Sequence, residues 1–187
     1  TAIVSLIIFA PLIGFLINGF NFKSKNYKLA GGIASGAAAL AFLGTLIAWS
    51  QLLQMPKGSE SFAVTMFNWI SFAGLDVKFE FIVDQLSIIM LSIITGVGTL
   101  IHIFSVGYMS HDERPAKYFA YLNLFLFNML LLVLGKNLLV MFVGWEGVGL
   151  CSYLLIGFWF KDKEKAAAGM KAFITNRIGD AGFLLGM

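Results

Sequence analysis

The chain is poor in charged residues and has almost no cysteine. Only 12% of its 187 residues are Asp, Glu, Lys or Arg, and 59% are hydrophobic, whereas a soluble domain has about 25% charged residues. The single cysteine, Cys151, cannot form an internal disulfide, and no Cys/His cluster has the spacing of a zinc or iron–sulfur site. A Gly-rich phosphate loop, a dinucleotide fingerprint and a serine-nucleophile elbow are also missing. These absences argue against the common soluble enzyme classes and predict an integral membrane protein.

Apolar segments recur along the chain and are separated by short polar loops. This pattern is typical of an all-α, polytopic transmembrane bundle. We expect about six helices, at residues 2–20, 29–54, 84–108, 116–134, 138–160 and 166–187, the last of them truncated. The whole chain then forms one domain, residues 1–187.

The loop between the second and third predicted helices is longer than the others. Residues Phe62–Trp69 and Val77–Phe81 partly alternate between apolar and polar side chains on either side of Gly74. Such alternation around a glycine indicates a short β-hairpin. The aromatic side chains of this hairpin, Trp69 among them, suit the membrane–water interface.

Basic residues are distributed unevenly between alternate loops. The first, third and fifth loops hold Lys23, Lys25, Lys28, Arg114, Lys117, Lys161, Lys163 and Lys165, and the other two hold Lys57, Lys78 and Lys136. The positive-inside rule therefore predicts cytoplasmic odd loops and an N-terminus outside. The formal net charge of +3 comes from helix ends rather than from a patch, so no nucleic-acid partner is indicated.

Glu146 is an isolated acid inside the predicted fifth helix. No other charged residue lies between Lys136 and Lys161, and the loop charges place Glu146 in the outer half of the membrane. An acid at such a position costs about 2–3 kcal/mol on insertion scales, so it is a functional candidate by default. Two interpretations remain open: a protonatable group on an ion path, or a structural acid bonded to a neighbouring helix.

The surroundings of Glu146 on the helix can also be predicted. At helical spacing Glu146 shares a face with Tyr153. Gly144, Gly147 and Gly149 leave a shallow groove that admits either a neighbouring helix or water.

The predicted sixth helix carries a second group of polar residues. Arg177 and Asp180 are three residues apart and can form an intrahelical ion pair, and Asn176 lies four residues before Asp180. The pair either belongs to an ion path or neutralises itself and only orients the helix. Lys171 is nearer the cytoplasmic end, where its side chain can extend to the interface.

Lys171, Tyr153 and His102 are weaker site candidates. His102 lies deep in the third predicted helix, and histidine is the side chain that titrates most readily near neutral pH. It is therefore either a proton relay or a buried histidine bonded to a neighbouring helix. Cys151 points away from Glu146 and is interpreted as a small buried apolar residue.

Several stretches of the sequence resemble a known family. WEGVGLCSYLLIGFW at Trp145–Trp159 and KAFITNRIGDAG at Lys171–Gly182 are similar to the antiporter-like L subunits of NADH:quinone oxidoreductase, the respiratory complex I. Supporting matches are Asp84–Ser87, Thr95–His102 and Phe119–Phe125. The resemblance covers nearly the whole chain and extends to the mitochondrial and chloroplast counterparts.

The resemblance implies roles for particular residues. Members of this family are much longer, so the chain is expected to be the N-terminal part of an antiporter-like proton-translocating domain. Glu146 corresponds to the acid that pairs with a lysine of a seventh helix, beyond Met187. Asp180 and Arg177 correspond to the charged residues of the sixth helix.

The resemblance also implies a function and a location. The chain is expected to be a non-redox subunit of a translocase, coupling quinone reduction in other subunits to proton pumping. It would bind no cofactor, with flavin, iron–sulfur clusters and quinone in partner subunits. Its partners would be the lipid bilayer, protons and other complex I membrane subunits, especially the adjacent antiporter-like subunit. The expected location is a bacterial inner membrane, with a periplasmic N-terminus and with an organelle inner membrane less favoured.

Two other functions remain. The large subunit of a multisubunit cation/proton antiporter shares the acid of the fifth helix, although the order EGVGLC from Glu146 to Cys151 favours the complex I subunit. A structural membrane scaffold without an ion path is the third interpretation.

Overall fold

The computed structural model describes residues 2–55, 61–72 and 75–187, which form six α-helices and one β-hairpin. The elements are α1 (Ala2–Phe20), α2 (Tyr27–Leu53), β1 (Ser61–Phe72), β2 (Leu75–Asp84), α3 (Gln85–Tyr108), α4 (Pro115–Leu134), α5 (Leu138–Ile156) and α6 (Lys163–Gly186). The predicted helical bundle and hairpin are therefore confirmed. Gly74, the expected turn, and Lys57 lie outside the described residues.

Side-chain caps set several helix ends. Asp84 begins α3 with a capping box, in which its carboxylate accepts from the Ser87 amide and the Ser87 hydroxyl accepts from the Asp84 amide. Asn137 caps α5 by accepting from the Val140 amide at 2.9 Å. These bonds satisfy amides that the first helical turn leaves without a partner.

The predicted end of the fifth helix at residue 160 is wrong, because α5 ends at Ile156. Gly157 caps the helix, its amide bonding back to Leu155 and Tyr153, and the chain then turns through residues 157–161. The indole of Trp159 donates to Asp112 at 2.9 Å, which directs the turn towards the α3–α4 loop. Glu146 consequently lies near the middle of α5, as its ninth residue of 19.

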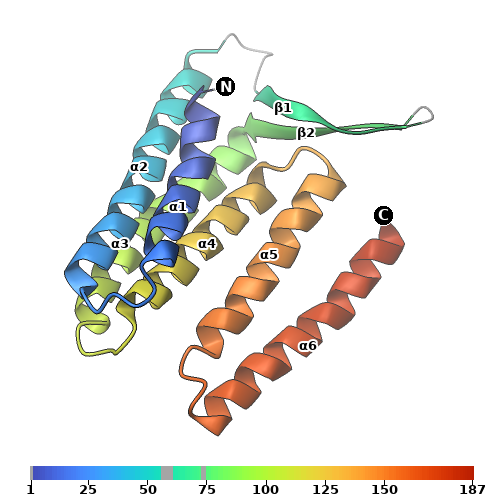
Figure 1. Ribbon diagram of the computed structural model, residues 1–187. Coiled ribbons are helices and arrows are strands. Elements are labelled where there is room, and N and C mark those ends of the chain that lie inside the picture. The colour runs from blue at the N-terminus through green and yellow to red at the C-terminus, as the bar shows by residue number, and fades with distance from the viewer. Residues whose placement is uncertain (1, 56–60, 73–74) are drawn as a thin grey trace.

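The helices run alternately up and down (Figure 1), so the α1–α2, α3–α4 and α5–α6 loops gather at one end of the bundle. The N-terminus, the hairpin and the end of α6 lie at the other end. The odd loops are thus together in space. Their assignment to the cytoplasm depends on the charge rule.

Small residues allow α2 to pack closely against α1 and α3. A Cβ added at Gly44 would lie 2.8 Å from Ile7, and one at Gly31 would lie 2.6 Å from Val106. Close backbone approach is how helices associate when lipid removes the hydrophobic drive. Ile7, like its neighbour Ile8, is fully buried in this core.

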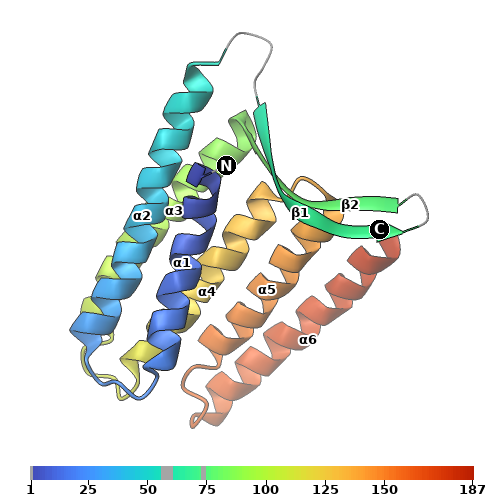
Figure 2. The same cartoon turned by 45° about the horizontal axis from the view of Figure 1, so that its top comes forward.

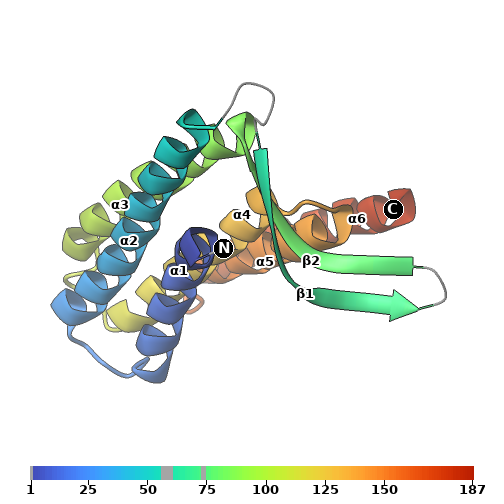
Figure 3. The ribbon, with the colours of Figure 1, turned by 90° about the horizontal axis from the view of Figure 1, so that it is seen from above.

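The β-hairpin is anchored on the turn between α4 and α5. Phe81 is fully buried and pairs with Gly135, and Glu80 forms an ion pair of 3.0 Å with Lys136. Asn137 donates its side-chain amide to the carbonyl of Lys78 at 2.8 Å. The rest of the hairpin extends sideways from this end of the bundle (Figures 2 and 3).

Five helices, α1 to α5, are long and apolar enough to cross a membrane, which makes this a multi-pass membrane protein. α6 is also long, at 24 residues, but it carries Lys163, Glu164, Lys165, Lys171, Arg177 and Asp180. The expected sixth crossing is therefore not supported by composition alone. Two of the charged residues of α6, Arg177 and Asp180, contact side chains of α5.

Candidate functional site

Glu146 forms an ion pair with Arg177 of α6. The two side chains are 27% and 38% exposed, and α5 and α6 pack side by side. A carboxylate in the middle of an apolar helix is therefore satisfied by a cation from the next helix along the chain. The sequence predicts an ion pair of Arg177 with Asp180 but not the ion pair of Arg177 with Glu146.

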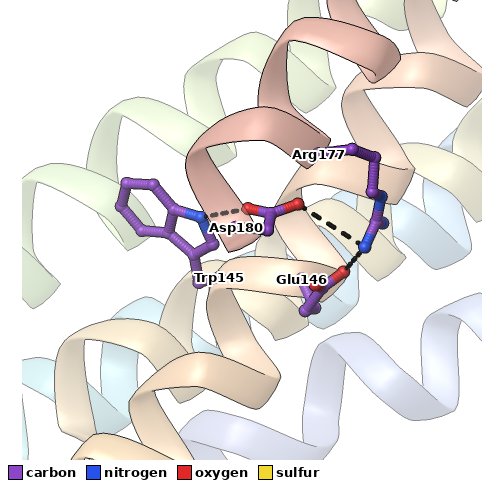
Figure 4. A network of polar contacts seen from close by, with 4 residues as sticks. All are labelled: Trp145, Glu146, Arg177 and Asp180. Atoms are coloured by element: carbon purple, nitrogen blue, oxygen red, sulfur yellow. Dashed lines mark hydrogen bonds and ion pairs between the residues drawn. The ribbon is translucent and has the colours of Figure 1, made fainter. Parts of the chain in front are cut away.

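Arg177 is shared between two carboxylates (Figure 4). Its terminal nitrogen also lies 3.5 Å from Asp180, so the intrahelical pair expected from the spacing is present. Asp180, whose side chain is only 6% exposed, accepts a hydrogen bond of 2.7 Å from the indole nitrogen of Trp145. The result is a continuous network, Trp145–Asp180–Arg177–Glu146, that joins α5 to α6.

The network contains two carboxylates and one guanidinium. Among the described residues no other lysine or arginine lies within ion-pair distance of either acid. With both acids ionised, the network therefore carries one uncompensated negative charge. A proton on Glu146 or Asp180, or a cation from outside the described chain, would neutralise it.

Two aromatic rings of α6, those of Phe173 and Phe183, pack against members of the network. The guanidinium of Arg177 lies over the ring of Phe173, with 4.6 Å between its central carbon and the ring centroid. Phe183 stacks against Trp145 at 6.0 Å. Such rings lower the local polarity, which strengthens the Coulomb interaction between Arg177 and the acids.

Two of the glycines near Glu146, Gly144 and Gly147, face helix α4. A Cβ at Gly144 would overlap the backbone of Leu132, and one at Gly147 would overlap the side chain of Asn128. Of the two alternatives, the groove admits a neighbouring helix, α4. Asn128 also donates a hydrogen bond of 3.5 Å to Cys151, which is fully buried as expected.

The other predicted candidates do not join the network. Lys171 is exposed, and Tyr153 contacts Phe173 with 5.2 Å between ring centroids. Asn176, expected near Asp180, makes no described hydrogen bond to it, although a Cβ at Gly149 would lie 3.7 Å from its amide nitrogen.

His102 lies apart, on α3. Its ring nitrogens are 2.7 Å from the carbonyl of Gly98 and 3.0 Å from the side-chain oxygen of Asn123 on α4. The side chain is almost fully buried. A proton relay and a buried histidine bonded to the next helix both agree with this geometry, so its role stays a prediction.

Trp145 and Asn128 were missed as site residues. Trp145 directly precedes Glu146, and a buried indole N–H usually has a hydrogen-bond partner. The sequence therefore indicates that Trp145 needs a hydrogen-bond acceptor, but it does not identify Asp180, which is 35 positions away. No group of three or more His, Cys, Asp or Glu side chains that could hold a metal was found in the part of the chain that the structure describes.

Two protein-family models match the chain. Residues 69–119 match the family model "NADH-Ubiquinone oxidoreductase (complex I), chain 5 N-terminus", and residues 135–187 match "NADH:quinone oxidoreductase/Mrp antiporter, TM". The chain is 43% identical to NADH-quinone oxidoreductase subunit L of Rhodobacter capsulatus over 98% of its own length. It is 44% identical to subunit L of Campylobacter jejuni over 100% and 41% identical to that of Escherichia coli over 95%.

The chain belongs to this subunit L family. It spans 26% to 29% of the length of these three relatives. The two matched segments include the α5–α6 pair, with Glu146, Arg177 and Asp180, and all of β2 and α3.

A solved structure shows the same fold. A chain of the membrane-bound sulfane sulfur reductase, an archaeal respiratory membrane complex, superposes with a TM-score of 0.79 at 20% identity. The match covers 100% of this chain and 36% of the other. The fold of this chain therefore recurs in a membrane complex of very different sequence.

Proposed function

We propose that this chain is the N-terminal part of a proton-translocating, antiporter-like subunit of an NADH:quinone oxidoreductase. Residues 1–187 would belong to one domain of that subunit, with an N-terminus on the periplasmic side of a bacterial inner membrane. Family membership supports the class of protein. The single observation that carries the mechanism is the shared Arg177 between Glu146 and Asp180.

The shared arginine gives the site two arrangements. When both acids are ionised, the guanidinium is attracted to each of them. Protonation of Asp180 removes one attraction and favours the pair with Glu146, whereas protonation of Glu146 favours the pair with Asp180. A charge that moves near either acid therefore changes where the proton is held, which couples the site to events elsewhere in the protein.

The chain itself would carry no redox centre. Flavin, iron–sulfur clusters and quinone would be held by partner subunits, and quinone reduction there would supply the free energy. Other complex I membrane subunits, among them an adjacent antiporter-like subunit, are the partners that this role requires. The family's lysine from a seventh helix would supply the second positive charge near Glu146.

The experiment is Glu146→Gln in the full-length protein, assembled in its complex and reconstituted in vesicles. Glutamine keeps the shape of the side chain but cannot bind or release the proton. We expect coupled quinone reduction and proton transport both to fall, by about tenfold or more. The matched control is Glu113→Gln, since Glu113 is 78% exposed in a loop and pairs with Lys161 at 3.8 Å. If both activities of Glu146→Gln equalled those of the control, Glu146 would have no role in translocation.

A cation/proton antiporter without redox input is the second candidate, because the model that matches residues 135–187 also describes Mrp antiporters. Proton movement driven by a sodium or potassium gradient in vesicles that contain no redox subunit would favour it. The names of the three relatives favour the oxidoreductase. A pure scaffold is the outcome if neither activity depends on Glu146.

A further inference from the structure

Aromatic side chains gather at the end of the bundle where the odd loops lie. Tyr118 contacts Phe158 and Trp159 contacts Tyr108, with 5.5 and 6.4 Å between ring centroids. Phe160 follows in the same turn and is 53% exposed. Rings with this distribution are characteristic of the headgroup level of a bilayer.

Two cations share one of these rings. The guanidinium of Arg114 lies 4.9 Å from the centroid of Phe160, and the ammonium of Lys117 lies 5.8 Å from the same centroid. Lys117 is also 5.5 Å from the centroid of Tyr121. Neither cation forms an ion pair with a carboxylate within the described ranges.

The nearby acids are engaged by other groups. Glu113 pairs with Lys161 at 3.8 Å, and Asp162 pairs with Lys165 at 3.3 Å. Asp112 accepts from the Trp159 indole and from the backbone amide of Arg114. The positive charge of the Arg114 and Lys117 side chains is therefore left for a ligand.

A cavity of about 190 Å³ lies beside Lys117, between α4 and the end of α5. Its lining is Lys117, Tyr121, Tyr153, Leu154, Gly157, Phe158 and Phe160. The lining thus combines the positive charge of Lys117 and two tyrosines with the apolar side chains of Leu154 and the phenylalanines.

We propose that this cavity binds the phosphate group of an anionic phospholipid. Lys117 holds it from the lining, and Arg114, outside the lining but against the ring of Phe160, adds a second positive charge. The glycerol and first acyl carbons would lie along Leu154 and Phe158. A membrane lipid is favoured over a soluble anion, because the lining combines charge with apolar surface at the ends of two spanning helices. The inference requires only that the chain crosses a membrane, and it is independent of the role of Glu146.

The test uses the full-length protein in detergent, depleted of lipid and then exposed to phosphatidylglycerol or phosphatidylcholine. Native mass spectrometry counts the lipid molecules that remain bound. We expect the protein to retain one phosphatidylglycerol more firmly than phosphatidylcholine. The double variant Arg114→Gln/Lys117→Gln should weaken that binding by roughly fivefold for each cation removed.

The control variant is Lys161→Gln/Lys165→Gln, which removes the same charge from two lysines already paired with acids. It should keep the selectivity of the unaltered protein. Equal retention of both lipids, or equal losses in the two double variants, would overturn the proposal.

Inorganic phosphate distinguishes the two sources of the ligand group. At millimolar concentration it should not displace the bound phosphatidylglycerol. Displacement of the phosphatidylglycerol by millimolar phosphate would instead assign the cavity to a soluble phosphate and refute the lipid assignment.

Discussion

At the scale of single residues, the choice of arginine at position 177 explains the site. A guanidinium presents several donors in a planar fork and stays charged in any protein environment, so it can face two carboxylates at once. A lysine ammonium is a compact charge that is more easily deprotonated when buried. Glu146 and Asp180 lie on different helices, and the same terminal nitrogen of Arg177 lies within ion-pair distance of both.

Trp145 positions the second acid, so Trp145→Phe should destabilise the α5–α6 pair. The change removes the 2.7 Å hydrogen bond to Asp180 but keeps a ring against Phe183. Hydrogen bonds to charged groups contribute about 1.5–3 kcal/mol, and we expect a loss of this size in the free energy of unfolding. It can be measured on the full-length protein in mixed micelles titrated with SDS.

A double-mutant cycle separates this bond from lost packing. In the background of Asp180→Asn the cost of Trp145→Phe should shrink, because the charged acceptor is gone. Trp69→Phe, on the hairpin and 40% exposed, serves as the control. Fully additive costs for Trp145 and Asp180 would contradict the assigned hydrogen bond.

At the scale of elements, the α4–α5 contact depends on two glycines. Gly144 faces the backbone of Leu132, which cannot turn aside, while Gly147 faces the flexible side chain of Asn128. Asn128 is buried and donates to Leu124 as well as Cys151, so moving it breaks hydrogen bonds. Neither position can accept a methyl group without cost.

Gly144→Ala and Gly147→Ala should therefore each destabilise the protein by about 1–3 kcal/mol, with Gly144→Ala the worse of the two. Gly179→Ala on α6 is the matched control, since nothing described lies within 4 Å of its added methyl. That change should be neutral or slightly stabilising, because alanine favours helix. The same SDS titration measures all three, and equal effects would mean that the close approach is not what selects glycine.

At the scale of the whole molecule, the hairpin is tied to the bundle by a titratable contact. The hydrogen bond from Lys136, followed by that from Thr65, holds the pKa of Glu80 below its ordinary value of 4.5. The folded state thus binds this proton more weakly than the unfolded chain does. The contact stabilises the hairpin above about pH 4.5 and loses its effect as the pH falls through the folded-state pKa.

Hydrogen–deuterium exchange of β2 tests this anchor in the full-length protein. After correction for the intrinsic rates, protection near residues 78–82 should fall between about pH 6 and about pH 3.5. In Glu80→Gln the protection should be lower at the higher pH and should change little between the two. A similar pH dependence in both proteins would assign the effect to another group.

The class of protein and the linear order of its elements follow from the amino-acid sequence alone. Long apolar segments must be helices in a membrane, since a bilayer leaves no other partner for backbone polar groups. Alternating residues near Gly74 predicted the hairpin, and the spacing of Arg177 and Asp180 predicted their contact. The motif around Glu146 identified the family, because those residues are adjacent in the chain.

Which charged side chains come into contact depends on how the helices pack. Hydropathy reports the cost of burying Glu146 but not its partner, because Arg177 lies 31 residues away in sequence on a separately packed helix. For the same reason, hydropathy does not predict the Trp145–Asp180 hydrogen bond. It also does not predict that Arg114 and Lys117 lie over the same ring, that of Phe160. The packing of α5 against α4 and α6 brings these side chains together. The glycines near Glu146 indicate a groove for a helix or for water, but not that α4 is the helix that fills it.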